Sequence, residues 1–421
     1  MTQSNSSFKL IKAARLIDGK SDRVIERGAI LIEGDRIRAI GPEEAVVPPE
    51  GARVEEFNYE GMTLLPGLVD CHVHLIGMGD GRAGDELAQL PDEVLTLQAA
   101  CNARAHLYSG VTTIRDCGAK NQTTFMLRSA IEMGITPGPR LSLSGRPLAI
   151  IGGHLSYFGI QATGSDECRA AVRQLVKEGA DFIKITATGG STRTSFPSRP
   201  SFSVEELTAI VEEAHSFGKH TAAHCSSSQG MVNALDAGID TILHATFREP
   251  DNSKRFRPEI AERIARQGVI VNPTLYGWRD QAIPLEEKLA SSGLTEQEQA
   301  RLDFLRREHE ATLECFARMR DFGIKMACGS DSAWGLYEMG GFQHEIAAHV
   351  EGGMSPMEAI VSATGDSAQS CWLDDEVGTL EQGKQADVLV VEGDPSQDIN
   401  VLWNVADVFQ GGKLVDRGSY V

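Results

Sequence analysis

Short apolar runs alternate with amphipathic stretches through the middle of this 421-residue chain, and this pattern constrains its fold most. Helical stretches such as 166–178, 204–217 and 229–237 lie between the apolar runs. Ser203, with Glu206 three residues later, is a cap for the second of these helices. Eight strands that alternate with helices predict an α/β fold, the (β/α)8 TIM barrel. The count, and the lack of a Gly-rich phosphate-binding motif, argue against a doubly wound sheet. The expected strands are 68–74, 111–117, 141–147, 181–188, 220–225, 241–246, 269–275 and 325–331.

Both ends of the chain consist of short strands separated by turns. An apolar strand is followed by Gly34-Asp35, a pair typical of tight hairpin turns. Because neither end is long enough to bury a core alone, we expect the two ends to pair. The predicted organisation is a small β-sandwich domain from residues 1–65 and 376–421, flanking a barrel domain from residues 66–375.

The charge balance excludes some classes of partner. Lys plus Arg number 40 against 59 Asp plus Glu, a formal net charge of −19, which argues against binding to nucleic acid or anionic membranes. No apolar run reaches membrane-spanning length, and residues 1–10 lack the apolar core of a signal peptide. The eight cysteines are scattered singly, as in reduced intracellular proteins. A cytoplasmic location is therefore expected.

A His-X-His pair ends the first expected strand, in the run Leu64-Leu65-Pro66-Gly67-Leu68-Val69-Asp70-Cys71-His72-Val73-His74. Alternate side chains of a strand point to the same face, so His72 and His74 are directed together. Histidine is the commonest metal ligand near neutral pH. The pair therefore predicts metal-dependent chemistry.

Four further polar residues end other expected strands: Lys184, His224, His244 and Asp331. In a barrel, the carboxyl ends of the strands meet at one mouth. Taken singly, each histidine could be structural, Lys184 a buried ion-pair or Schiff-base residue, and Asp331 a helix cap. Together with the His-X-His pair they predict one site. Histidines in helical stretches, such as His106 and His349, are expected at the surface.

This combination of residues resembles the amidohydrolase superfamily, in its branch with a binuclear metal centre. The resemblance extends over nearly the whole chain, and its matching stretches are 110–116 (Gly-Val-Thr-Thr-Ile-Arg-Asp), Gly152-Gly153-His154 and 377–387. In detail the chain is most similar to the Xaa-Pro dipeptidase-like and imidazolonepropionase-like members.

The resemblance implies two divalent ions at the barrel mouth. The histidines of the first strand would hold one ion, and those of the fifth and sixth strands the other. The lysine, carboxylated on its amine by CO₂, would bridge both ions, and the aspartate would bind the first ion and carry protons for a bridging hydroxide. Zinc is the expected metal, with manganese, cobalt, iron and nickel as alternatives. The implied ligands are His72, His74, Lys184, His224, His244 and Asp331.

Substrate contacts are expected from the loops that follow the strands. By the resemblance, His154, with Tyr157 nearby, would help to hold a substrate carboxylate. The similar proteins place an aromatic hydroxyl near the fourth-strand loop, where this chain has Arg193 and Arg199 instead. Either arginine could contact a carboxylate through two hydrogen bonds or face solvent. Tyr276 could line an apolar pocket or pack in the core.

The expected function is hydrolysis of an amide-type C–N bond in a small substrate, a dipeptide or an N-acyl amino acid. An aryl urea, a carbamate or another xenobiotic amide is the close alternative. A mononuclear deaminase would lack Lys184, a Schiff-base aldolase would not need four histidines, and a non-catalytic scaffold would lack ligands. A homo-oligomer is expected from the resemblance. The charged segment 284–320 is expected to be a surface helix pair, with a lid or a subunit contact as alternatives.

Overall fold

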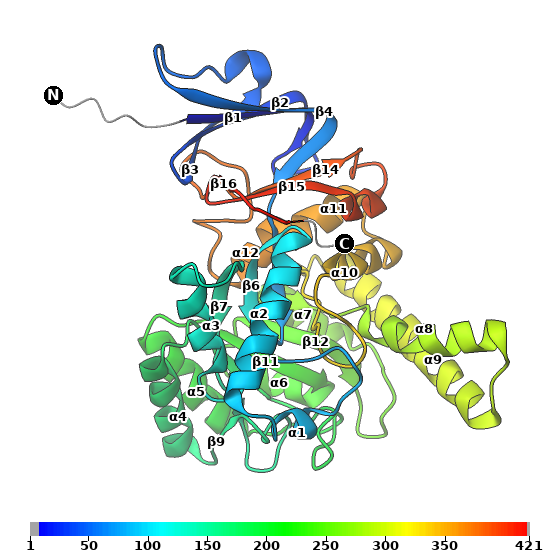
Figure 1. Cartoon of the computed structure of the whole chain (residues 1–421). Coiled ribbons are helices and arrows are strands. Elements are labelled where there is room, and N and C mark those ends of the chain that lie inside the picture. Colours follow the sequence, from blue (N-terminus) through cyan, green and yellow to red (C-terminus); the bar gives the residue numbers. More distant parts are fainter. Residues whose placement is uncertain (1–7, 419–421) are drawn as a thin grey trace.

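The computed structural model of the chain describes residues 8–418. Both ends lie together in one β-rich part, and the helices and parallel strands of the middle form a larger body beside it (Figure 1). The β-rich part is a single hydrogen-bonded sheet in the order β16-β15-β14-β4-β1-β2-β3, so the two ends pair as expected. Its strands are β1 (Phe8–Ile17), β2 (Val24–Glu33), β3 (Arg36–Pro42), β4 (Val54–Pro66), β14 (Val388–Glu392), β15 (Val405–Gln410) and β16 (Lys413–Leu414).

A tight turn and a pairing between distant strands explain how this sheet is connected. Glu33 pairs with Arg36 across a two-residue turn, and Gly34 has a φ of 65°, a value that glycine adopts without strain. Leu64 and Leu65 of β4 pair with Val390 and Leu389 of β14. Because only Gly67 separates β4 from β5 (Leu68–Val73), the first strand of the larger body, this pairing fixes the C-terminal strands next to that body.

The larger body contains two sheets of parallel strands, in the orders β5-β6-β7 and β13-β12-β11-β10-β8-β9. A hydrogen bond from the Asp181 amide to the Leu143 carbonyl links the two sheets. Seven of the expected strands are present, with bounds that differ by a few residues. The strands are β5 (Leu68–Val73), β6 (Val111–Asp116), β7 (Arg140–Leu143), β8 (Leu148–Ala149), β9 (Ile160–Gln161), β10 (Ile183–Ile185), β11 (Thr221–Ser227), β12 (Thr241–Arg248) and β13 (Ile270–Asn272).

The expected eighth strand, 325–331, is not a regular strand, which corrects the sequence prediction. Isolated parallel bridges join Met326 to Val271 of β13 and Ser332 to Val73 of β5. The extended conformation is interrupted because Asp331 has a φ of 54°. This segment nevertheless connects the outer strands of both sheets.

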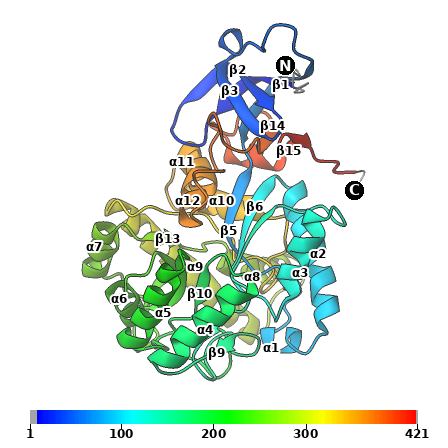
Figure 2. The ribbon, with the colours of Figure 1, turned by 90° about the vertical axis from the view of Figure 1, so that its left-hand side faces the viewer.

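Helices surround the parallel strands (Figure 2). The capping box predicted at Ser203 and Glu206 is present at the start of α5. The helices are α1 (Gly84–Leu87), α2 (Asp92–Tyr108), α3 (Thr123–Glu132), α4 (Ser165–Glu178), α5 (Val204–Ser216), α6 (Ser228–Asp236), α7 (Pro258–Gln267), α8 (Gly277–Ser291), α9 (Glu296–Asp321), α10 (Phe342–Glu351), α11 (Pro356–Val361) and α12 (Ser367–Ser370). Short turns add η1 (Glu43–Ala45), η2 (Ser362–Asp366) and η3 (Ile399–Trp403).

The segment 284–320 belongs to a pair of helices, α8 and α9, that projects from the body (Figure 1). Ala282, Leu302 and Leu305 form a separate small core between them. The capping box of Thr295 and Glu298 begins α9. Within residues 8–418, no helix combines the length and the apolar character needed to cross a membrane.

Candidate functional site

His72 and His74 are held in one orientation each by a hydrogen bond to the ring nitrogen Nδ1. The partner of His72 Nδ1 is the Asn272 side-chain oxygen at 2.9 Å, and that of His74 Nδ1 is the Gly118 carbonyl at 2.9 Å. Both acceptors place the proton on Nδ1. The unprotonated Nε2 atoms remain available, as metal ligands would require.

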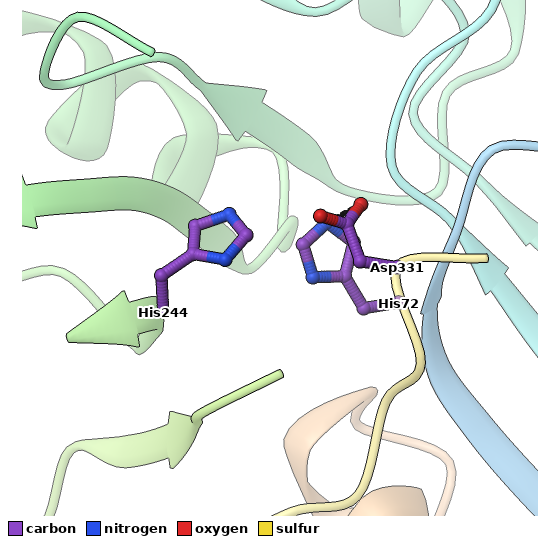
Figure 3. A group of neighbouring side chains, drawn as sticks. All are labelled: His72, His244 and Asp331. Carbon is purple, nitrogen blue, oxygen red and sulfur yellow. Dashed lines mark ion pairs between the residues drawn. The ribbon is translucent and has the colours of Figure 1, made fainter. Parts of the chain in front are cut away.

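Asp331 lies against the free nitrogen of each of these histidines. Its Oδ1 atom is 3.3 Å from His72 Nε2 and 3.4 Å from His74 Nε2. One ligand atom each from His72, His244 and Asp331 fall within 4.8 Å of one another. Figure 3 shows these three side chains, which come from separate segments, pointing toward a common space.

His224 and His244 extend the cluster. The ring centres of these two histidines are 4.5 Å apart, and that of His244 is 5.2 Å from that of His72. His244 Nδ1 contacts the Thr274 hydroxyl at 2.7 Å, and His224 Nε2 contacts the Gly189 carbonyl at 3.1 Å. The opposite ring nitrogen of each therefore remains for a ligand.

Lys184 enters the cluster from β10 with its ammonium 3.2 Å from His72 Nε2. The side chain is buried, and within residues 8–418 no carboxylate lies within ion-pair distance of it. An unpaired buried ammonium is unfavourable, and burial lowers the pKa of this amine. The environment therefore favours a neutral amine at Lys184.

Burial also determines the protonation states of the other members. It lowers the pKa of His74 and of His224 to about 3, and that of His72 and His244 well below the usual range. It raises the pKa of Asp331 to about 7. The site thus combines neutral imidazoles with a carboxyl group able to exchange protons near neutral pH.

Three residues of the site occupy the left-handed backbone region, in which residues other than glycine are strained. His244 has a φ of 72°, Thr274 of 52° and Asp331 of 54°. Such conformations persist where the surrounding structure imposes them, and they concentrate at functional sites. The strain supports a functional role for the ends of these strands.

The cluster lies at the base of a cavity of about 810 Å³. Its wall includes His154, Tyr157 and Arg193, three of the residues predicted to contact substrate. His154 Nδ1 is 3.1 Å from the Thr192 hydroxyl, and its ring centre is 4.5 Å from that of His224. Gly190 must lack a side chain, because a Cβ there would lie 2.6 Å from the His154 ring.

Two other residues predicted to contact substrate, Arg199 and Tyr276, do not line this cavity. Arg199 stacks on the Phe196 ring at 4.8 Å and is not part of the cavity wall. Tyr276 stacks on His344, with ring centres 4.6 Å apart, and is likewise outside the wall. The alternatives noted for them, a solvent-facing loop residue and core packing, describe their positions better.

The expectation that the helical histidines lie at the surface is wrong for His106 and His349, which are both buried. His106 Nε2 donates to Asp70 at 3.0 Å, and His349 Nε2 is 3.7 Å from Glu345. Asp70 lies two residues before His72 in the His-X-His run, but its pairing with His106 joins residues 36 positions apart and has no local signal. These histidines have structural partners and do not line the cavity.

Sequence analysis also missed Asn272 and Thr274, whose side chains orient His72 and His244. Both lie within the seventh predicted strand, 269–275, which carries no histidine. A polar residue at a strand end was the only signal available for them.

Comparisons with known proteins agree on one relationship. The family model described as "Amidohydrolase family" matches residues 63–415. Ochratoxinase from Aspergillus niger is 30% identical over 96% of this chain and 86% of its own length. The crystal structure of a Xaa-Pro dipeptidase with bound methionine has a TM-score of 0.81 and 31% identity, covering 97% of this chain and 99% of that one. A prolidase complexed with N-methylphosphonate-L-proline has a TM-score of 0.82 and 25% identity, covering 98% and 100%.

Proposed function

The chain belongs to the amidohydrolase family, and from that premise we propose that the strand-end cluster is a centre for two divalent metal ions. Membership makes the protein a metal-dependent hydrolase of amide-type carbon–nitrogen bonds. The observation that carries the two-metal proposal is the convergence of His72, His244 and Asp331, with Lys184 and the remaining histidines beside them.

The donor set fits divalent ions such as zinc. The four imidazoles are neutral, and each has its other ring nitrogen held by an oxygen acceptor, the usual support for a metal-bound histidine. His72 and His74 would hold one ion, and His224 and His244 the other. Bound ions would activate a water molecule and polarise the scissile carbonyl.

Lys184 is proposed to act as a bridging ligand after reaction with CO₂. Its neutral amine nitrogen would bond to the carbon of CO₂ and release one proton, giving an N-carboxylated lysine. The buried position without a carboxylate partner supports this reaction, because it favours the neutral amine. The product replaces a positive charge that would repel the ions with an anionic group.

Asp331 is proposed as the proton carrier. Its carboxylate would take a proton from the attacking water and deliver it to the leaving nitrogen. Burial raises the pKa of Asp331 to about 7 in the metal-free site, and its Oδ1 faces the nitrogens of both His72 and His74.

The proposed substrates are dipeptides or N-acyl amino acids with a free carboxylate. Two of the similar structures hold methionine and a proline phosphonate, ligands that carry an amino-acid carboxylate. His154 and Arg193 in the cavity wall could bind such a group. Aromatic residues of the wall, Trp278, Trp334 and Tyr337, favour an aryl amide, urea or carbamate as the second candidate class.

The closure of the barrel and the domain boundaries are also part of this proposal. We propose that residues 66–375 close into a (β/α)8 barrel and that residues 1–65 and 376–421 form the small domain. The bridges of Met326 and Ser332 to the outer strands of the two parallel sheets support closure. A homo-oligomeric state and a cytoplasmic location stay predictions.

Metal analysis and a substrate panel test the proposal together. We expect about two equivalents of zinc per chain, hydrolysis of N-acyl amino acids or dipeptides, and loss of activity on chelation. Lys184→Ala should bind fewer ions, and a small carboxylate such as formate should restore part of its activity. A metal-loaded protein that hydrolyses no dipeptide, N-acyl amino acid, aryl urea or carbamate would contradict the proposal.

A further inference from the structure

Two cationic side chains, Arg248 and Lys254, pair with one carboxylate, that of Glu308 in α9. We call these three residues the cationic cluster. Arg248 Nη2 is 2.7 Å and Lys254 Nζ 3.1 Å from Glu308 Oε2. The side chains are 12%, 3% and 14% exposed, in the order given. Among the described residues, no other carboxylate pairs with either cation. With both cations protonated, the cluster carries one formal net positive charge with little access to solvent, and burial lowers the pKa of Lys254.

The other hydrogen bonds and the ring contact of the two cations do not neutralise this charge. Arg248 Nη1 donates to the Asn252 carbonyl at 2.9 Å, and Lys254 donates to the Thr312 hydroxyl at 2.7 Å and lies 5.2 Å from the centre of the Trp278 ring. These contacts satisfy hydrogen bonds and hold the helix pair against β12, but they supply no formal negative charge. A buried excess charge is unfavourable unless an anion compensates it.

Arg248 lines the cavity, where its guanidinium can contact a bound molecule. His244, Thr246 and Arg248 alternate along β12, and all three are part of the cavity wall. The backbone between His244 and Arg248 is irregular, with positive φ at His244, Ala245 and Phe247, and the residues at both ends of this stretch line the cavity. Thr312 and Trp278 of the helix pair line the same wall.

We infer that the cationic cluster is a subsite for a carboxylate of the substrate that is remote from the scissile bond. This inference rests on the proposed function and narrows it: the preferred amides carry a second acidic group in addition to the one next to the cleaved bond. Arg248 would make the contact, while Lys254 keeps Glu308 from neutralising it fully. The helix pair would then contribute to specificity through Glu308 and Thr312.

Matched substrates test the inference through the charge alone. N-benzoylglutamate and N-benzoylglutamine differ only in a remote carboxylate or amide on the amine side of the cleaved bond. N-glutaryl-phenylalanine and its terminal amide differ in the same way on the acyl side. We expect wild-type kcat/KM to favour the acid at least about tenfold in one of the pairs, mainly through KM. Arg248→Met should abolish this preference by raising KM for the acid far more than KM for the neutral member.

Glu308→Gln should change the preference for the acidic substrate in the opposite direction to Arg248→Met. This difference distinguishes a role in substrate recognition from a role in folding. Removing the competing carboxylate should strengthen the preference for the acid, whereas a merely structural cluster would weaken activity with both members equally. Arg255→Met is the matched control, because Arg255 is exposed and pairs with Asp251 outside the cavity wall. Metal content and the thermal unfolding midpoint should be measured for each variant.

Calorimetric binding of glutarate to the zinc-loaded protein tests the subsite without turnover. We expect Arg248→Met to weaken the dissociation constant at least about tenfold and Glu308→Gln to strengthen it. Equal affinity of wild type and Arg248→Met, together with equal rates for both members of each pair, would overturn the inference. A protein that binds glutarate through Arg248 but hydrolyses no amide would overturn the proposed function and leave the subsite in place.

Discussion

Asp331 shows how one residue combines backbone strain with proton chemistry. Its φ of 54° directs the carboxylate toward His72 and His74, and burial raises the pKa of this carboxyl to about 7. A carboxyl group with a pKa near the working pH can both accept and release a proton within one reaction cycle. The strained backbone and the raised pKa therefore serve the same proposed step.

Asp331→Asn is expected to reduce kcat by about 10²–10⁴-fold while largely preserving the fold. Asparagine tolerates the left-handed backbone region and keeps the size of the side chain, but its amide cannot carry the proton. Steady-state kinetics and the thermal unfolding midpoint measure the two effects. Asp80→Asn, at an exposed residue paired with Arg82, is the control, and an Asp331 variant with wild-type kcat would disprove the proton role.

Asn272 provides a second test at this scale, because its oxygen holds the Nδ1 proton of His72. Asn272→Ala is expected to weaken metal binding about 10–100-fold, since the ring loses the partner that fixes its orientation. Competition with a chelator measures this affinity. Asn272→Asp keeps the acceptor but sets a carboxylate oxygen against the Ala327 and Gly329 carbonyls, so it should recover only part of the affinity. Equal affinity in the alanine variant and the wild type would contradict this role.

Among the elements, β5 and the segment 325–332 are joined by one buried carboxylate. Asp70 accepts hydrogen bonds from the amides of His72 and Ser330, at 3.1 and 3.0 Å, and from the Ser330 hydroxyl at 2.6 Å. His106 Nε2 of α2 is a further donor, at 3.0 Å. Asp70 thereby fixes the separation between the strand that carries His72 and the segment that carries Asp331.

Asp70→Asn is expected to lower the free energy of unfolding by about 2–4 kcal/mol, because the new amide group faces donors at a buried position. Urea unfolding measures this change. We also expect weaker metal binding, since His72 and Asp331 lose their common support. An exposed substitution on the same helix as His106, Glu93→Gln, should change stability by less than about 0.5 kcal/mol. Unchanged unfolding in Asp70→Asn would show that the network is dispensable.

The elements that the sequence predicted well are those specified by local pattern. Apolar runs with polar ends located β5, β10, β11 and β12, and the residues expected to converge there do so. The irregular segment 325–332 could not be predicted, because its path depends on hydrogen bonds to Asp70 on a distant strand. The burial of His106 has the same cause, and Tyr276 was misplaced because its partner His344 lies far along the chain.

At the scale of the whole molecule, the buried site links stability to pH. The unfolded chain protonates each histidine near pH 6.5, whereas burial lowers the pKa of His74 and His224 to about 3 in the metal-free fold. The unfolded state therefore binds more protons as the pH falls below about 7. Asp331 and Asp116 act in the opposite direction, because burial raises the pKa of these carboxyls to about 7 and about 6.

Among the described residues, burial lowers the pKa of seven imidazoles and raises the pKa of five carboxyls, so metal-free protein is expected to lose several kcal/mol of stability between pH 7 and pH 5. Denaturant unfolding of chelator-treated protein across this range measures the loss. His224→Asn removes one such imidazole and should make the slope shallower by about 1.4 kcal/mol per pH unit. Saturating zinc should raise stability at pH 7 and lose this benefit on acidification, because protons compete for the same nitrogens. A metal-free protein whose stability is constant or rises as the pH falls would show that the imidazoles are not held neutral by burial.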